Sequence, residues 1–415
     1  MTDAQLRDAA LVELRETTRG LKGFTPPSTS HWAKALDFLY QIGKAEEPPL
    51  PPSAIAALPI SPQPYTVPIG VQVSNYAALK TEINKGTPVI VLAPGIYDGA
   101  MLTPVANQLI ISETLLGAEL RCGIEIHNPG IILQGIKFKW SDPTKLLQNT
   151  GIHCWGSGKG WSVLDCELRG SDTISAGLYA YLEGTAKRLR IGQFHNFGLR
   201  IAAWGQPGYT YIPANPAVVE DVYAEDCVWK NNPNGSNGNA EVPIFIGMRT
   251  NAKRIHAHQN LGYASDKGGL AGGIEAATNC DASFLEDVTV TGELVFGIYL
   301  EHFNRFCIWK RVYLGPTTEV GFHCEWADPD WDSIPGAKKV VLEDSVIESS
   351  CIGVNLDEGT EEVTVRNTIF QGQQWCCINN FKGVNNVFPN NVYKGSAPPL
   401  RTTHYYDSPC AGPGS

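Results

Sequence analysis

The sequence lacks the long apolar runs, basic clusters and paired cysteines that mark several common protein classes. No apolar run approaches the about 18 residues that a membrane-spanning helix needs, and no cationic flank precedes a hydrophobic region at the N-terminus. The 415 residues contain 32 Lys and Arg against 42 Asp and Glu, a net charge of -10. Because nucleic-acid binding requires clustered cations that displace phosphate counterions, nucleic acid is excluded as the main partner. We expect neither a membrane span nor a standard secretion signal.

Regular C-x-x-C spacing is missing from the 11 cysteines, whose number is odd. Most of them occupy apolar positions in alternating segments, as Cys154, Cys280, Cys324 and Cys351 do. We therefore expect small core residues in a protein made in a reducing cytosol, and not a disulfide framework or a zinc site.

Residues with metal-ligand chemistry are present but poorly spaced. The histidines without convincing zinc spacing are His256, His258 and His302. In DPDWD, alternating Asp328, Asp330 and Asp332 offer the oxygen ligands that calcium prefers, but the segment lacks the glycine and distal glutamate of an EF-hand loop. We predict an exposed acidic loop and no cofactor, with calcium at these aspartates as the alternative.

The chain divides by pattern into four parts. Residues 1–45 carry two helical periods and form an N-terminal cap or attachment segment, and the proline-rich residues 46–65 form a linker. From about residue 66 no long helical period remains, and short apolar-alternating segments run to residue 395. Residues 396–415 form a short C-terminal tail without coiled-coil heptads.

The alternating segments repeat. The glycines Gly273, Gly297 and Gly321 are spaced by roughly 24 residues, which is within the range of solenoid repeats. The second and fourth residues of each segment are apolar, and a second short strand follows each one. The aligned segments are GIHCW (151–155), GLYAY (177–181), GLRIA (198–202), FIGMR (245–249, without the leading Gly), GIEAA (273–277), GIYLE (297–301), GFHCE (321–325) and GVNLD (353–357). This pattern predicts an all-β fold, a single parallel β-helix over residues 66–395.

Two stretches carry a family resemblance. VIVLAPGIYDG (89–99) and GAELRCGIEIHNPGIILQGIKF (117–138) resemble the opening coils of the right-handed parallel β-helix superfamily of pectate lyase-like proteins. ELRETTRGLKGF and HWAKALDFL look like the N-termini of phage tail proteins. The resemblance implies a tailspike-type protein in the virion tail, made in the host cytoplasm, attached through its N-terminal helices and assembled as a homotrimer. A secreted or cell-surface location is the alternative.

Stacked coils place equivalent outward residues about 4.8 Å apart, as ladders on one face. The predicted third-position ladder is His153, Tyr179, Arg200, Gly247, Glu275, Tyr299, His323 and Asn355. The predicted fifth-position ladder is Trp155, Tyr181, Ala202, Arg249, Ala277, Glu301, Glu325 and Asp357. Aromatic rings, guanidinium groups and carboxylates on one strip suit the binding of an elongated sugar chain.

Three carboxylates in successive coils, Glu301, Glu325 and Asp357, repel one another, which a fold optimised only for stability would avoid. Glycoside hydrolysis uses two carboxyl groups, about 5 Å apart for retention or roughly 6.5–9.5 Å for inversion. We predict Glu325 as the general acid and Asp357 or Glu301 as the base. A plain solvated face and non-catalytic sugar contacts are the alternatives.

The sequence thus predicts a phage-type depolymerase that hydrolyses neutral or mixed surface glycans. The alternatives are a non-catalytic glycan-binding virion or adhesin protein, and a polysaccharide lyase. Loops 203–216 and 326–336 are expected to rise on the same edge and to add aromatic contacts. The predicted substrate-binding residues are Tyr179, Tyr181, Arg200, Trp204, Arg249, Glu275, Tyr299, His323, Trp326 and Trp331.

Overall fold

The computed structural model describes ten stretches of the chain, all within one unit, Pro51–Ser415. They are residues 65–171, 173–181, 183–202, 215–227, 242–247, 249–259, 272–276, 282–301, 304–325 and 336–409. The predicted helical segment 1–45 and linker residues 46–64 lie outside them. No helix in these stretches is long and apolar enough to cross a membrane.

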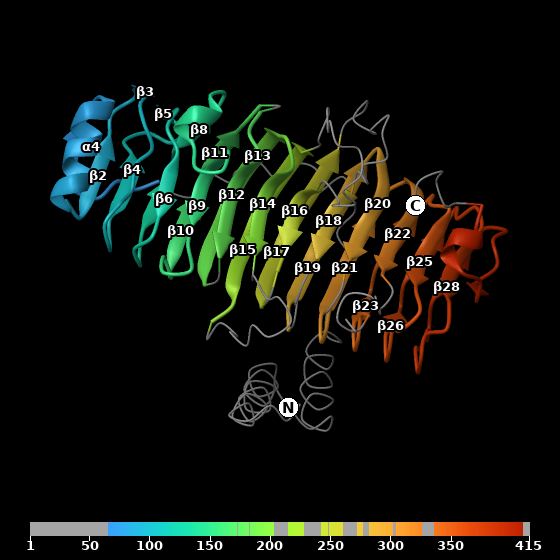
Figure 1. Ribbon diagram of the computed structural model, residues 1–415. Helices are drawn as coiled ribbons and strands as arrows, with labels where there is room; N and C mark the ends of the chain where they lie inside the picture. The colour runs from blue at the N-terminus through green and yellow to red at the C-terminus, as the bar shows by residue number, and fades with distance from the viewer. Residues whose placement is uncertain are drawn as a thin grey trace. The chain divides into compact units, whose positions relative to one another are not determined.

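Every named strand pairs in parallel with strands of the neighbouring coils, and the strands follow one another along the body in sequence order (Figure 1). The first sheet has 11 strands, one from each coil from β6 onward. They are β6 (Ile124–Ile126), β9 (Thr150–Cys154), β12 (Ala176–Tyr181), β14 (Phe197–Ala202), β16 (Val242–Ile246), β18 (Gly272–Ala276), β20 (Leu294–Leu300), β22 (Thr317–Cys324), β25 (Ile352–Leu356), β28 (Cys376–Asn380) and β30 (Leu400–Arg401).

The second sheet has 19 strands and is bent, because β10 and β11 both pair with the longer β13. Each coil therefore gives this sheet two arms, either as two short strands or as one bent strand. The strands are β1 (Val71–Val73), β2 (Val89–Leu92), β3 (Gly95–Tyr97), β4 (Leu109–Ser112), β5 (Ala118–Leu120), β7 (Ile132–Gln134), β8 (Lys137–Lys139), β10 (Trp161–Leu164), β11 (Glu167–Arg169), β13 (Gly184–Phe194), β15 (Ala217–Cys227), β17 (Thr250–Gln259), β19 (Phe284–Gly292), β21 (Ile308–Leu314), β23 (Val341–Glu343), β24 (Val346–Glu348), β26 (Thr364–Arg366), β27 (Ile369–Gln371) and β29 (Val392–Lys394).

The core is a continuous column of inward apolar residues enclosed by the two sheets. Leu178 opposes Leu199, and Ile298 opposes Phe322, so equivalent positions stack coil on coil as predicted. These four side chains are fully buried. The parallel β-helix predicted from the glycine-led segments is confirmed, and β30 continues it past residue 395.

The first coil is covered by a helix that the sequence pattern did not predict, α4 (Tyr76–Lys85). Asn75 caps its N-terminus, and Gly86 ends it in the left-handed region at φ 74°. Only Leu79 and Ile83 of its ten residues are buried, so its apolar face is too narrow to stand out among the surrounding strands. Two single-turn 3-10 helices, η2 (Pro143–Lys145) and η3 (Tyr405–Asp407), complete the described elements.

The predicted register of one coil is wrong. The sequence alignment predicts Ile246 and Met248 as its inward pair, whereas β16 places Ile244 opposite Ile274. The inward residues of β16 are Ile244 and Ile246, both fully buried. Pro243 takes the place of the leading glycine, and a shift of two residues preserves the inward–outward alternation, so the pattern alone did not reveal the slip.

The shift also moves two residues of the predicted ladders. Phe245, not Gly247, lies opposite Arg200 and Glu275. Arg249 lies beyond the strand, in the turn before β17, with a left-handed φ of 49°. It is therefore not a fifth-position residue.

Eight cysteines in the described stretches are free and buried, as the core prediction requires: Cys122, Cys154, Cys166, Cys227, Cys307, Cys324, Cys376 and Cys377. Cys351 is also buried, as predicted, but it is disulfide-bonded, which contradicts the expectation that the cysteines form no disulfides.

The bend of the 19-stranded sheet is a ladder of residues in the left-handed region. Their φ values run from 51° to 59° at Asp165, Arg188, Asp221, Arg254, Asp287, Arg311, Asp344, Asn367 and Asn390. A left-handed conformation costs a non-glycine residue roughly 1–2 kcal/mol. Asp and Asn tolerate it best, and the arginines alternate with aspartates along the ladder.

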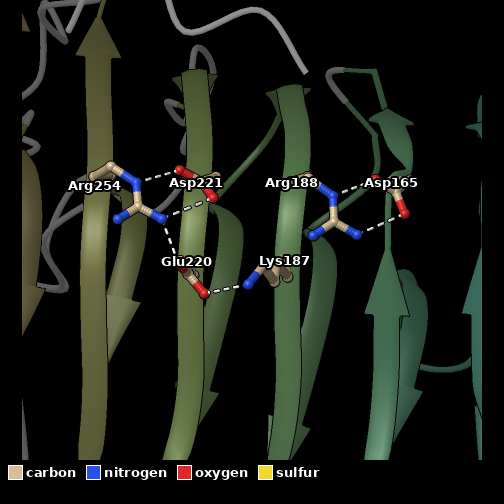
Figure 2. Close-up of polar contacts among 6 residues, drawn as sticks. All are labelled: Asp165, Lys187, Arg188, Glu220, Asp221 and Arg254. Atoms are coloured by element: carbon tan, nitrogen blue, oxygen red, sulfur yellow. Dashed lines mark hydrogen bonds and ion pairs between the residues drawn. The ribbon is translucent and has the colours of Figure 1, made fainter. Parts of the chain in front are cut away.

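Charge alternates coil by coil at the bend (Figure 2). Arg188 pairs with Asp165 of the coil before it, and Arg254 pairs with Asp221, with Arg254 Nε 2.6 Å from Asp221 Oδ1. One residue earlier in each coil, Lys187 Nζ lies 2.5 Å from Glu220 Oε2. Successive coils thus carry the pairs Lys187–Arg188, Glu220–Asp221, Lys253–Arg254, Glu286–Asp287, Lys310–Arg311 and Glu343–Asp344. We call this arrangement the charge lattice.

Two substitutions of Arg254 distinguish the contribution of the ion pairs to stability from the cost of the left-handed backbone conformation. Arg254→Asn removes the ion pairs to Glu220 and Asp221 but keeps a residue that the chain itself uses at this bend, so we expect a loss of about 1 kcal/mol in the free energy of unfolding. Arg254→Val adds the left-handed strain of a β-branched residue, roughly 1–2 kcal/mol more. Thermal unfolding midpoints should rank wild type above Asn above Val; equal midpoints for Asn and Val would contradict the strain argument.

Candidate functional site

The outer face of the 11-stranded sheet carries the third-position ladder in register. Backbone pairing joins His153 to Tyr179, Tyr179 to Arg200, and Glu275 to Tyr299. The observed ladder is Glu125, His153, Tyr179, Arg200, Phe245, Glu275, Tyr299, His323, Asn355, Asn379 and Arg401. Of the predicted members, only Gly247 is replaced.

Most of this ladder is buried, although the sequence predicts an outward, solvated strip. Glu275 is 5% exposed, His323 4% and His153 1%. The reason is a second outward row that is apolar and packs against the ladder rings in two clusters. One contains Phe197 and Phe245; the other contains Phe296 and Tyr405, which comes from beyond the last strand.

The fifth-position carboxylates stack as predicted. The backbone N–H of Glu325 donates to the carbonyl of Leu300 at 3.0 Å, and the N–H of Asp357 donates to the carbonyl of Cys324 at 3.1 Å. Glu301, Glu325 and Asp357 therefore follow β20, β22 and β25 in successive coils.

The carboxyl of Glu275 interacts electrostatically with those of Glu301 and Glu325. We call these three residues the acidic centre. Burial raises the pKa of Glu275 well above its ordinary value of 4.5, and the charges of Glu301 and Glu325 raise it further while Arg200 opposes them. Glu275 Oε2 is buried without a hydrogen-bond partner. The sequence predicts Glu275 as a sugar contact; its burial, which the sequence did not reveal, makes it the carboxyl of this face that is suited to hold a proton.

Tyr299 links the acidic centre to the next coil. Burial raises the pKa of Tyr299 well above 10, as do the charge of Glu325 and a hydrogen bond between the two side chains. The neutral phenol is thus the donor and Glu325 the acceptor. This contact stabilises the ionised form of the Glu325 carboxylate.

Asp357 belongs to a different network. Its Oδ2 lies 3.2 Å from His323 Nε2, and its Oδ1 accepts from Asn355 Nδ2 at 3.0 Å. Asn379 Nδ2 in turn donates to Asn355 Oδ1 at 2.7 Å. Both oxygens of Asp357 are therefore engaged by neighbouring side chains.

Aromatic rings gather at the other end of the same face. The ring centroids of His153 and Trp155 lie 4.3 Å apart, and Trp155 and Tyr181 stack at 6.1 Å. Tyr181 OH donates to Tyr179 OH at 2.9 Å. The rings of His153, Trp155 and Tyr181 stack on one another, which covers part of their faces.

The placement of several predicted site residues is not part of the described structure, and one predicted residue lies elsewhere. Trp204, Trp326 and Trp331 lie outside the described residues, as do Asp328, Asp330 and Asp332. Arg249 lies in a turn, as given above. No group of three or more His, Cys, Asp or Glu side chains that could hold a metal ion occurs within the described ranges.

The fold can be compared with known proteins. No protein-family model matches the chain, and no curated protein does. Among solved structures, the Dettilon tailspike protein is similar, with a TM-score of 0.52 and 11% identity over 77% of this chain. The chain spans 64% of that tailspike's length. A PL6 alginate lyase in complex with a trisaccharide has a TM-score of 0.53 and 11% identity, with 79% of this chain and 86% of the lyase covered.

The chain is a right-handed parallel β-helix protein. At 11% identity the likeness establishes the fold and leaves the activity to the residues of the site.

The buried Glu275 makes stability depend on pH. Because the folded state raises the pKa of Glu275 above the value of 4.5, it binds more protons than the unfolded state above that pH, and stability falls as the pH rises. Glu275→Gln removes this titration. We expect its melting temperature to match wild type near pH 4 and to exceed it increasingly towards pH 7. The exposed Glu113→Gln is the control, and a pH-independent difference for Glu275→Gln would contradict the argument.

The buried His153 should affect the pH dependence of stability in the opposite direction to Glu275. Burial lowers the pKa of His153 to about 4 from 6.5, so the unfolded state binds more protons between these values and stability is lost as the pH falls through them. His153→Phe keeps a ring against Trp155 without a titrating group. The variant should lose less melting temperature than wild type between pH 6.5 and 4; His404→Asn, at a half-buried ring, should not reproduce this protection.

Proposed function

We propose that this protein is a phage tail-type surface-polysaccharide depolymerase that hydrolyses glycosidic bonds on the outer face of the 11-stranded sheet. The observation that carries the proposal is the acidic centre, in which burial and the charges of Glu301 and Glu325 raise the pKa of Glu275 and so favour its protonated form. Glycosidases need such a pair, with one carboxyl protonated and one ionised.

A polysaccharide suits the geometry and the fold. The ladder extends over eleven coils, so an elongated ligand can contact many of them in a repeating way. Similar folds are found in a tailspike protein and in alginate lyases that were solved with oligosaccharides. These likenesses support the polysaccharide, while the acidic centre supports hydrolysis.

The described geometry changes the roles predicted from the sequence. Glu275 takes the part of the general acid, in place of Glu325, because it is buried and next to other carboxyls. Glu325 acts as the base or nucleophile, since the Tyr299 hydroxyl stabilises its ionised form. Glu301 keeps the proton on Glu275 through its charge, and Asp357 positions His323.

In this scheme Glu275 protonates the glycosidic oxygen as the bond to the leaving sugar breaks. Glu325 either attacks the anomeric carbon or takes a proton from the attacking water. Because water is largely excluded from the acidic centre, the electrostatic interactions of Glu275 and Glu325 with the substrate are stronger than they would be in water.

A lyase is the second candidate, because the solved structures of similar fold include alginate lyases and Tyr299 and His323 lie in adjacent coils. A lyase leaves an unsaturated uronate, which absorbs in the ultraviolet, whereas a hydrolase does not. Attachment to a phage tail through residues 1–45 and a homotrimeric state remain parts of this proposal and come from the sequence resemblance.

The acidic centre can be tested by substitution. On a panel of bacterial capsules and O-antigens, wild type should release reducing ends without ultraviolet absorbance. We expect Glu275→Gln and Glu325→Gln each to lower the rate at least 100-fold while sparing binding, because general acid–base groups contribute about 10²–10⁴-fold. Glu113→Gln should cleave at the wild-type rate. Undiminished cleavage by Glu275→Gln would contradict the assignment of Glu275 as the general acid. A gain in ultraviolet absorbance with the wild-type protein would favour the lyase.

The pH dependence of the cleavage rate should reveal the titration of the Glu275 carboxyl. The rate falls as the pH rises through the pKa of Glu275, which lies above 4.5. Glu301→Gln removes the charge that contributes most after burial, so the falling limb should move to lower pH. A limb that stays in place in this variant would show that another group titrates.

A further inference from the structure

Arg200 occupies an unusual position on the same face. It lies in the third-position ladder between Tyr179 of the coil before it and Phe245 of the coil after it. Its Cζ atom lies 5.0 Å from the Tyr179 ring centroid, 4.5 Å from that of Phe245 and 4.6 Å from that of Phe197. The guanidinium group is therefore held in a slot of three rings.

Within the described residues the Arg200 guanidinium makes no hydrogen bond or ion pair, and its Nε is buried without an acceptor. Arginines at the sheet bend behave differently. Arg188 and Arg254 each give two hydrogen bonds to one aspartate. Arg200 thus keeps its full set of donors.

Ring contacts compensate only part of the desolvation of this cation. A cation–π contact contributes about 0.5–2 kcal/mol and satisfies none of the N–H donors. A planar guanidinium fork prefers a carboxylate, which it binds with two parallel hydrogen bonds. Since the rings already fix the fork, little conformational freedom is lost when such a group binds.

The acidic residue of the ladder that interacts with Arg200 does not fill this role. Glu275 interacts with Arg200 electrostatically, but the two form no ion pair and Glu275 Oε2 also lacks a hydrogen-bond partner. Two coils separate them, about 10 Å along the body. Both groups are therefore directed to a face where a third molecule can meet them.

We propose that Arg200 binds the carboxylate of an acidic sugar, so that the substrate is a carboxylated polysaccharide with that unit about two coils from Glu275. This inference rests on the proposed function and narrows it. The sequence favours neutral or mixed glycans because the acidic ladder should repel an anion. Glu301 and Glu325, however, lie three and four coils from Arg200, about 14 and 19 Å along the body, so they repel a carboxylate at Arg200 less than one at the acidic centre.

Binding of the monosaccharide glucuronate tests the assignment directly, with glucose and sulfate as comparison probes. Calorimetric titration of the full chain should show binding of glucuronate and weaker binding of the other two. Arg200→Gln should weaken glucuronate at least tenfold, and Arg200→Lys, which keeps the charge but loses the fork, should fall between. Melting temperatures of the variants establish that they fold.

Arg401→Gln is the matched control, because Arg401 lies in the same ladder over the Trp375 ring at 4.8 Å but donates to the Trp375 carbonyl. It should bind glucuronate as wild type does. Absence of glucuronate binding, equal binding of sulfate, or wild-type affinity in Arg200→Gln would each overturn the proposal.

The same variants distinguish this inference from the proposed function. Glucuronate binding that depends on Arg200, in a protein that cleaves no polysaccharide, would uphold the carboxylate site and refute the hydrolase. Cleavage of a neutral polysaccharide at the wild-type rate by Arg200→Gln would uphold the hydrolase and refute the carboxylate site.

Discussion

The left-handed bend of the 19-stranded sheet is the constraint on which the stacking of the body depends. Each bend residue sits in a conformation that L-residues disfavour, and each coil must nonetheless repeat it at the same height. Aspartate and asparagine accept this backbone, while each arginine between them is held by carboxylates of the coil before it. The ion pairs thus compensate the strain at the place where it arises, and they fix which coil lies on which.

The register of coil on coil that is fixed at this bend also holds on the outer face of the 11-stranded sheet. Because strands of the 11-stranded sheet follow from the same coils, Glu275, Tyr299 and Glu325 hold their relative heights without a dedicated scaffold. The apolar row beside them excludes water, which turns an ordinary stack of acidic residues into a centre with a raised pKa. The same row supplies Phe197, one of the three rings around Arg200. Burial and charge on this face therefore have one origin, in the outward apolar row.

Much of the fold could be predicted from the sequence because glycine-led segments keep both their phase and their apolar alternation. Ile298 and Leu300 were identifiable as core for that reason. The coil of Phe245 was not, since a proline replaces its glycine and a shift of two residues leaves the alternation intact. Helix α4 was missed because it buries only two side chains.

The site was harder to predict. The alternation shows that Glu275 points outward, but exposure on this face depends on what packs beside each residue, and one apolar cluster includes Tyr405 from beyond the last strand. The charge lattice was not predicted, although its signal is present in the sequence: adjacent pairs of one sign alternate along the chain at Lys187–Arg188, Glu220–Asp221 and Lys253–Arg254. Set against the repeat, these pairs predict ion pairs between coils.

The alternation of sign gives the body a repeat of two coils, although its backbone repeats with every coil. Loss or duplication of a single coil within Lys187–Asp344 would bring two cationic or two anionic rows face to face. Gain or loss of two coils would keep opposite charges in contact. Change in length of this part of the protein during evolution, or by design, is therefore expected to proceed in even steps.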